Sequence, residues 1–279
     1  MTARRVGDSS GRTLAYRIIH QELHLKILIL SPHRDDAAFS LSIAITSWLT
    51  ARHTVTILNV FTRSRYAPYS DADFVHENDQ LSYVSAMRLR EDEHFLRRIT
   101  EALPKGLKSN LHMVDLNLKD APIRLRIPLE ELSDTPVNPA DPAIEKIRKT
   151  LTQQAEAGAM EALVLPAALG KDVDHLTVRE AALPFTTGLP SAFYEDLPYA
   201  AKYPSAATDL ELLRERNEPL TPVTYQIESA IEFKRRLILG YASQIDDDAG
   251  TLIADFAQRY NGGERLWANK AWLDGSVTK

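Results

Sequence analysis

The feature that most constrains the fold is a short apolar run that ends in a proline, a histidine and two adjacent carboxylates. The run is ILIL, residues 27–30, which follows Lys26 and is followed at once by SPHRDD, residues 31–36. An apolar segment with helical spacing then resumes over residues 39–49. A buried parallel strand that leads into a helix has this pattern. Because ligands bind at the carboxyl ends of strands in open α/β sheets, the polar residues of this motif are candidate site residues.

Strand-like and helix-like segments alternate along the rest of the chain. Strands are predicted at residues 25–31, 54–61, 110–117, 161–166, 191–194 and 221–225, and helices at residues 36–52, 81–100, 142–158, 227–244 and 251–260. Two strands joined through a helix form a right-handed βαβ unit. The alternation therefore predicts an α/β fold, a Rossmann-like three-layer sandwich with a mainly parallel sheet. We expect one domain over residues 1–279, with residues 1–24 as a lead-in and residues from about 200 to 279 as a C-terminal elaboration.

Composition excludes several classes of function. The chain of 279 residues has a formal net charge of −5 and no block of Lys and Arg, which argues against a nucleic-acid partner. It has no cysteine, which excludes disulfides, thiolate metal sites and cysteine nucleophiles. No stretch is long and apolar enough for a bilayer, and the first residues lack a secretory signal. We therefore expect a cytoplasmic protein without a membrane partner.

A second polar cluster follows a later strand-like run. The run EALVLP, residues 161–166, leads through a small-residue loop into DVDH, residues 172–175, at the start of a helix. Taken alone, each cluster also fits an ordinary helix start, where acidic side chains cap the helix or interact with its dipole. Both clusters, however, follow strands whose carboxyl ends lie at the same edge of the proposed sheet. Together they offer two imidazoles and a carboxylate, the ligand set of a catalytic Zn²⁺ with an open position for water.

Such a site has a clear chemical use. Two neutral imidazoles and one carboxylate leave a divalent cation with net positive charge, which lowers the pKa of a bound water and polarises a carbonyl. A spare carboxylate at Asp35 would then be placed to accept the proton of the water. No glycine-rich phosphate loop or Gly-x-Ser-x-Gly elbow offers a competing site.

The order and spacing of these motifs resemble the LmbE-like (PIG-L) zinc-dependent de-N-acetylase family. That family has Pro-His-x-Asp-Asp after its first strand and His-x-Asp-His after a later one. The segments YEDLPY (194–199), YASQ (241–244, with Lys234) and GERLW (263–267) are similar to segments of one bacterial branch, so the likeness covers about residues 25 to 270. The resemblance implies that His33, Asp36 and His175 are zinc ligands and that Asp35 is the general base.

Substrate contacts are implied at further positions. Arg88 lies where the family has an arginine that usually points at the substrate, and a solvated helix charge is the alternative. Arg124 ends the segment DAPIR (120–124), which resembles a substrate-side loop, although a plain turn explains it nearly as well. The long polar segment 62–80 is typical of a lid or binding loop. Loop residues that could contact a substrate are Arg63, Tyr66, His76 and Tyr199.

Asp172 departs from the family pattern, because the family usually has a histidine there that polarises the amide carbonyl or protonates the leaving group. An ionised aspartate only accepts hydrogen bonds. Three outcomes are open. Asp172 acts as a protonated acid because nearby carboxylates such as Asp174 raise its pKa, His76 replaces the imidazole, or turnover is slow or absent. Asp172 and Asp174 are therefore candidate catalytic residues beside Asp35.

We expect a zinc-dependent hydrolase that uses a metal-activated water to remove an N-acyl group, in the first instance acetyl, from a sugar-containing small molecule. The substrate class comes from the resemblance alone, and the expected partner is an N-acylated glycoside, with a homo-oligomer left open. Two alternatives remain. One is a catalytically impaired small-molecule binding protein on the same fold. The other is an amidase acting on a larger amide, such as a thiol conjugate or an antibiotic intermediate.

Overall fold

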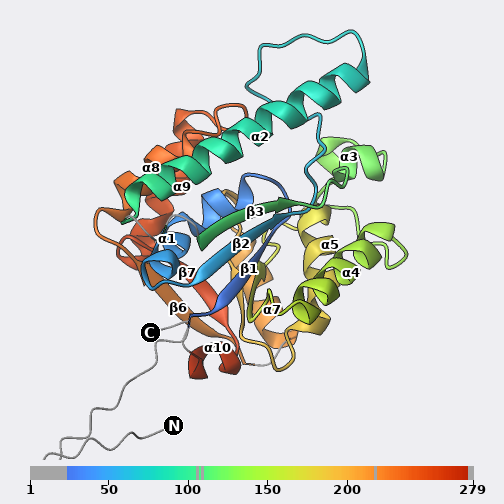
Figure 1. Cartoon of the computed structure of the whole chain (residues 1–279). Coiled ribbons are helices and arrows are strands. Elements are labelled where there is room, and N and C mark those ends of the chain that lie inside the picture. The colour runs from blue at the N-terminus through green and yellow to red at the C-terminus, as the bar shows by residue number, and fades with distance from the viewer. Residues whose placement is uncertain (1–23, 105–106, 108–109, 217–218, 276–279) are drawn as a thin grey trace, which may run out of the picture.

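The first strand and helix form the centre of the molecule. A computed structural model of the chain describes residues 24–104, 107, 110–216 and 219–275 (Figure 1). Of the lead-in predicted for residues 1–24, all but the last residue lies outside the described residues. The apolar run is β1 (Lys26–Ser31), in which Ile27 to Leu30 are at most 1% exposed. It leads into α1 (Asp36–Thr50), whose first eleven residues are all buried.

Within the described residues, seven strands form one sheet in the order β3-β2-β1-β4-β5-β7-β6. The first five in this order are parallel to one another: β3 (Leu111–Asp115), β2 (Thr54–Asn59), β1, β4 (Ala162–Pro166) and β5 (Ser191–Tyr194). Strand β7 (Gly263–Ala268) pairs antiparallel with β5 and with β6 (Thr221–Gln226). The predicted α/β fold with a mainly parallel sheet is confirmed. The strand order reverses between β1 and β4, which is where doubly wound sheets have their ligand crevice.

Helices cover both faces of this sheet (Figure 1). On one face, α8 (Ala230–Ile238) contacts α1, α2 (Glu77–Ala102) and α9 (Asp247–Phe256). On the other face, α4 (Pro142–Glu156) packs against α5 (Val173–Ala182). Helices cover both faces because the strand order runs in opposite directions on the two sides of the reversal between β1 and β4. Right-handed crossovers that run in opposite directions place their helices on opposite faces of a sheet. Short helices in the connections are α3 (Ala121–Arg124), α6 (Tyr199–Lys202), α7 (Ala206–Arg216) and α10 (Lys270–Asp274).

The main difference from the sequence prediction is β7, which the strand pattern did not identify. Its segment GERLWA carries two adjacent charges, which are unusual in a strand between two others. The structure accommodates Glu264 because Lys234 of α8 lies 2.5 Å away and both side chains are buried. The helix predicted over residues 227–244 is also shorter, since α8 ends at Ile238. Among the described helices, none combines the length and the apolar character needed to cross a bilayer.

Candidate active site

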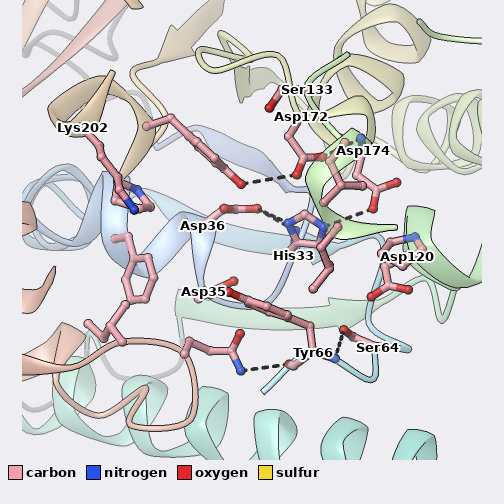
Figure 2. A pocket seen from close by; sticks show the side chains of 18 of the residues that line it. His33, Asp35, Asp36, Ser64, Tyr66, Asp120, Ser133, Asp172, Asp174 and Lys202 are labelled. Carbon is pink, nitrogen blue, oxygen red and sulfur yellow. Dashed lines mark hydrogen bonds and ion pairs between the residues drawn. The ribbon is translucent and has the colours of Figure 1, made fainter. Parts of the chain in front are cut away.

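A cavity of about 340 Å³ opens at the carboxyl ends of β1 and β4, where the strand order reverses (Figure 2). The connections that follow β1, β2, β3, β4 and β5 all contribute to it. The polar residues that line it are His33, Asp35, Asp36, Ser64, Tyr66, Arg88, Asp120, Ser133, Asp172, Asp174, Tyr199, Lys202, Tyr203 and Gln244.

Three residues implied as metal ligands lie together here: His33 and Asp36 line the cavity, and His175 is fully buried next to Asp36. Asp36 Oδ2 lies 3.4 Å from His33 Nδ1 and 3.3 Å from His175 Nε2. The two imidazole centroids are 5.3 Å apart, and ligand atoms of the three residues all lie within 4.8 Å of one another. His33 and His175 are far apart in the sequence but close in space, because β4 pairs directly with β1 and the loops after these two strands are neighbours. Figure 2 shows His33 with interactions to Asp36 and to Asp174.

His175 is held in the orientation of a metal ligand. Its Nδ1 lies 2.6 Å from Asp196 Oδ1, and both residues are fully buried. Its other ring nitrogen, Nε2, is buried without a hydrogen-bond partner and faces Asp36. A carboxylate behind the imidazole fixes the ring and its tautomer at many metal sites. One ring nitrogen of His33, one carboxylate oxygen of Asp36 and the unpartnered Nε2 of His175 therefore fit a divalent cation.

A second group of potential ligands shares His33 and includes Asp172 and Asp174, again within 4.8 Å. The carboxylates of this group already have other partners. Asp172 Oδ1 accepts the backbone N–H of Asp174 at 2.8 Å, and Asp174 Oδ2 accepts that of Ala121 at 2.8 Å. The group with His175, whose Nε2 has no other partner, is the better candidate.

The electrostatic field of the cluster favours positive charge. Burial disfavours the charged form of His33, but Asp174 and Asp36 outweigh it and raise the pKa of His33 to about 10. Burial acts in the same way on His175, and Asp36 and Asp196 raise its pKa well above the usual value. Burial works against ionisation of Asp36, yet the two imidazoles hold its pKa well below the usual range. A field that stabilises an imidazolium also favours a bound divalent cation.

Asp35 lines the cavity and is paired with Arg88 of α2. The guanidinium Nη2 donates to Asp35 Oδ1 at 2.8 Å. Arg88 is only 4% exposed, so it is not a solvated helix charge. Their ion pair fixes the Asp35 carboxylate next to the candidate ligand Asp36.

Arg124 contacts Asp174 and does not line the cavity. Its Nη1 donates to Asp174 Oδ1 at 2.7 Å, and its Nε donates to Asp141 Oδ2 at 2.9 Å. The guanidinium also lies 4.3 Å from the centroid of the Phe61 ring. Arg124 thus anchors the loop after β3 to the first turn of α5 and holds the carboxylate that contacts His33.

Asp172 combines a helix cap with a place in the cavity. It is the N-cap of α5, as the helix-start interpretation predicts, and its side chain accepts the N–H of Asp174. Its Oδ2 accepts a hydrogen bond from the Tyr199 hydroxyl at 3.3 Å. The Tyr199 ring meets His175 edge-on, with centroids 5.4 Å apart. Burial, and then the charge of Asp172, raise the pKa of Tyr199 well above its usual value, so its hydroxyl remains a donor.

The structure does not bring every predicted contact residue to the cavity. Tyr66 lines it and is 43% exposed, whereas Arg63 and His76 are exposed and lie outside the lining. Sequence reasoning missed Asp196 and Asp120. Asp196 lies in the connection just after β5, which ends at Tyr194, and Asp120 lies in the connection after β3, which ends at Asp115. A carboxylate that closely follows a parallel strand is the signal that could have identified them.

Comparisons with known proteins bear on the family and the fold of the chain. No family model matches the chain. It is 30% identical to the 2'-N-acetylparomamine deacetylase of Streptomyces fradiae over 249 residues, and the aligned region covers 87% of this chain and 81% of that protein. Its fold is similar to that of the A40926 pseudoaglycone deacetylase, with a TM-score of 0.60 and 19% identity over 88% of this chain and 98% of that one. It is also similar to the N,N'-diacetylchitobiose deacetylase from Pyrococcus horikoshii, with a TM-score of 0.52 and 17% identity over 89% of this chain and 85% of that one.

The structural neighbours are distant in sequence and show the fold alone. The Streptomyces fradiae relative is close enough, over enough of both chains, to show the family. The chain therefore belongs to the LmbE-like family of de-N-acetylases.

Proposed function

We propose that this protein hydrolyses the N-acetyl group of an amino sugar in a small glycoside, with Zn²⁺ held by His33, Asp36 and His175. The observation that carries the proposal is the clustering of these three side chains, two of which line the cavity, with the buried His175 oriented by Asp196. The similarity to a relative named for the deacetylation of 2'-N-acetylparomamine supports an acetylated amino sugar as the substrate.

Each step of the hydrolysis has a residue available for it. A zinc ion, when bound, would supply the charge that acidifies water and polarises the amide carbonyl. Asp35 accepts the proton of the attacking water, and its ion pair with Arg88 holds the carboxylate in position. The same carboxyl group then gives this proton to the departing nitrogen, so that one water and one amide yield acetate and a free amine.

The charge of the cavity favours a substrate with further amino groups. The carboxylates of Asp120 and Asp172 line it, and among the described residues neither is paired with a guanidinium. Asp174, in contrast, is paired with Arg124, Arg88 is paired with Asp35, and Lys202 is the other cation among the described lining residues. Such an excess of carboxylates attracts ammonium groups and repels anionic substrates. We therefore propose a cationic glycoside of the aminoglycoside type.

The size of the site allows a second ring. A neighbouring cavity of about 380 Å³ shares four lining residues with the first: Tyr66, Asp120, Pro122 and Leu129. The acetylated ring would occupy the cavity with the metal cluster, and the second ring would extend over Tyr66 and Leu129 towards the neighbouring cavity.

Metal content and acetate release test this proposal together. We expect about one zinc per chain and acetate release from N-acetylated paromamine at a higher rate than from N-acetylglucosamine. The variant His33→Ala is expected to lose zinc and activity. The matched variant His112→Ala, which removes an exposed imidazole on β3 away from the site, is expected to keep both. Folded, zinc-loaded protein that releases acetate from no N-acetylated amino sugar would contradict the proposal and favour the binding-protein alternative.

A further inference from the structure

A hydrogen-bond donor at the amide oxygen would assist hydrolysis at this site, and the carboxylates cannot provide one. When water adds to the amide carbon, the π electrons of the C=O bond move to oxygen, and a preorganised donor at that oxygen stabilises the developing charge. Asp172 and Asp174 line the cavity and offer carboxylate oxygens that lie within 4.8 Å of a ring nitrogen of His33 and of each other. As ionised groups they accept hydrogen bonds and would repel an oxyanion.

Tyr199 places a neutral donor next to the metal cluster. Its ring packs edge-on against His175, and its hydroxyl lies 3.3 Å from Asp172 Oδ2. That distance is well beyond the 2.7–2.8 Å typical of a strong O–H···O bond, so the hydroxyl can exchange this partner for another at little cost. Tyr66 also lines the cavity, but it is 43% exposed and is therefore the less constrained donor.

The backbone after β4 is shaped to receive the Tyr199 ring. Gly170 has φ +85°, and a Cβ atom at this position would lie 2.8 Å from Tyr199 Cδ1 and 2.9 Å from its Cβ and Cγ. A side chain at residue 170 would therefore displace the ring. The same loop carries Asp172 and leads to His175, so the connection after β4 positions both the His175 imidazole and Gly170, against which the Tyr199 ring packs.

We propose that Tyr199 is a catalytic residue that donates a hydrogen bond to the amide oxygen as negative charge develops on it. Asp172 accepts this hydrogen bond before substrate is bound and so aims the hydroxyl at the cavity. Tyr199 keeps its proton throughout. The bond from water oxygen to carbon forms as the π pair moves to the amide oxygen, and the C–N bond breaks as that pair returns and nitrogen takes the proton from Asp35.

The inference rests on the proposed deacetylation and is tested with Tyr199→Phe. The matched control is Tyr69→Phe, because Tyr69 also donates its hydroxyl to a carboxylate, Asp246 Oδ2 at 3.0 Å, but lies outside the cavity. We expect kcat of Tyr199→Phe to fall about 100-fold, the loss typical of one oxyanion donor. Its KM should change less than about threefold, since the interaction forms in the transition state. Zinc content should match wild type, and Tyr69→Phe should match it in every measurement.

A second substrate separates catalysis from packing. An N-trifluoroacetyl group stabilises its own oxyanion by electron withdrawal, so the Tyr199→Phe penalty should be several-fold smaller with this substrate than with N-acetyl. An unchanged kcat, a loss confined to KM, or equal penalties for both substrates would each overturn the role of Tyr199 while leaving the deacetylation intact. Wild-type protein without activity on any acetylated amino sugar would instead overturn the proposed function, and the inference with it.

Discussion

Asp196 provides the sharpest test of the proposed metal site, because it touches a ligand without being one. Its Oδ1 lies 2.6 Å from His175 Nδ1, and its Oδ2 accepts the backbone N–H of Leu169 at 3.1 Å. When His175 Nε2 faces a metal, Nδ1 carries the proton and is a donor. Both carboxylate oxygens therefore receive an N–H donor, in a place with no access to water.

The substitution Asp196→Asn removes the charge and one of these two acceptors. Whichever way the amide is oriented, its NH₂ group faces an N–H donor, and a buried unsatisfied group costs about 1–3 kcal/mol of stability. Loss of the carboxylate behind a metal-bound imidazole typically weakens metal binding about 10- to 100-fold. That factor corresponds to about 1.4–2.7 kcal/mol of binding free energy.

The neighbouring residue supplies a matched control. Glu195 is also buried, and its two oxygens also take two donors, Tyr260 Oη at 2.7 Å and Trp267 Nε1 at 2.8 Å. Glu195→Gln is expected to lose a similar amount of stability without any change in zinc affinity. Zinc affinity is measured by competition with a chromophoric chelator, and stability by urea denaturation of the zinc-free proteins. Equal zinc affinity in wild type and Asp196→Asn, or equal weakening in both variants, would refute the reasoning.

Three further perturbations follow from the structure. Lys234→Met leaves the buried Glu264 carboxylate without its cation and should lower the free energy of unfolding, measured by urea titration, by about 3–5 kcal/mol. The double variant Lys234→Met with Glu264→Gln should recover part of this loss, and an equal loss in the single and double variants would contradict the role of the ion pair. The Nδ1 atom of His53 accepts the N–H of Leu25, and burial lowers the pKa of this imidazole. Neutral His53 therefore contributes fully to the stability of the fold above the unfolded pKa of about 6.5, and this contribution is lost as pH falls through the folded pKa. The Tm of wild type should therefore fall more steeply between pH 7 and 5 than that of His53→Asn, which keeps an acceptor but does not titrate, and parallel curves would argue against it. Chelation should lower Tm, and zinc at about 100 times its Kd should restore about 2.7 kcal/mol, whereas a Tm insensitive to both would speak against a folded-state metal site.

The predicted fold agrees with the structure where local pattern and topology rules act together. The run of β1 and the start of α1 are consecutive in the chain, so the hydrophobic pattern alone places the motif at a strand end. The strand β7 was missed because its Glu264 breaks that pattern. Only the neighbouring Lys234, from a different helix, makes a buried carboxylate there tolerable.

The candidate site divides in a similar way. His33 and His175 were expected at one edge of the sheet because both follow parallel strands, and β4 indeed pairs with β1. The contacts of Arg124 could not be predicted from its position after a strand. Its segment suggested a substrate contact, but in three dimensions its guanidinium is used by Asp141 and Asp174. A charged side chain in a loop carries no information in the sequence about which of several carboxylates it will meet.

The sequence by itself determined the residue types of the site, the strand ends that carry them and the metal chemistry they allow, because strand, loop and helix are covalently consecutive. Only the tertiary structure decided how each group is held. It placed Asp196 behind His175 and brought the Tyr199 ring against Gly170. These contacts join loops from different strands, and their geometry depends on strand register and side-chain packing, which hydrophobic periodicity does not encode.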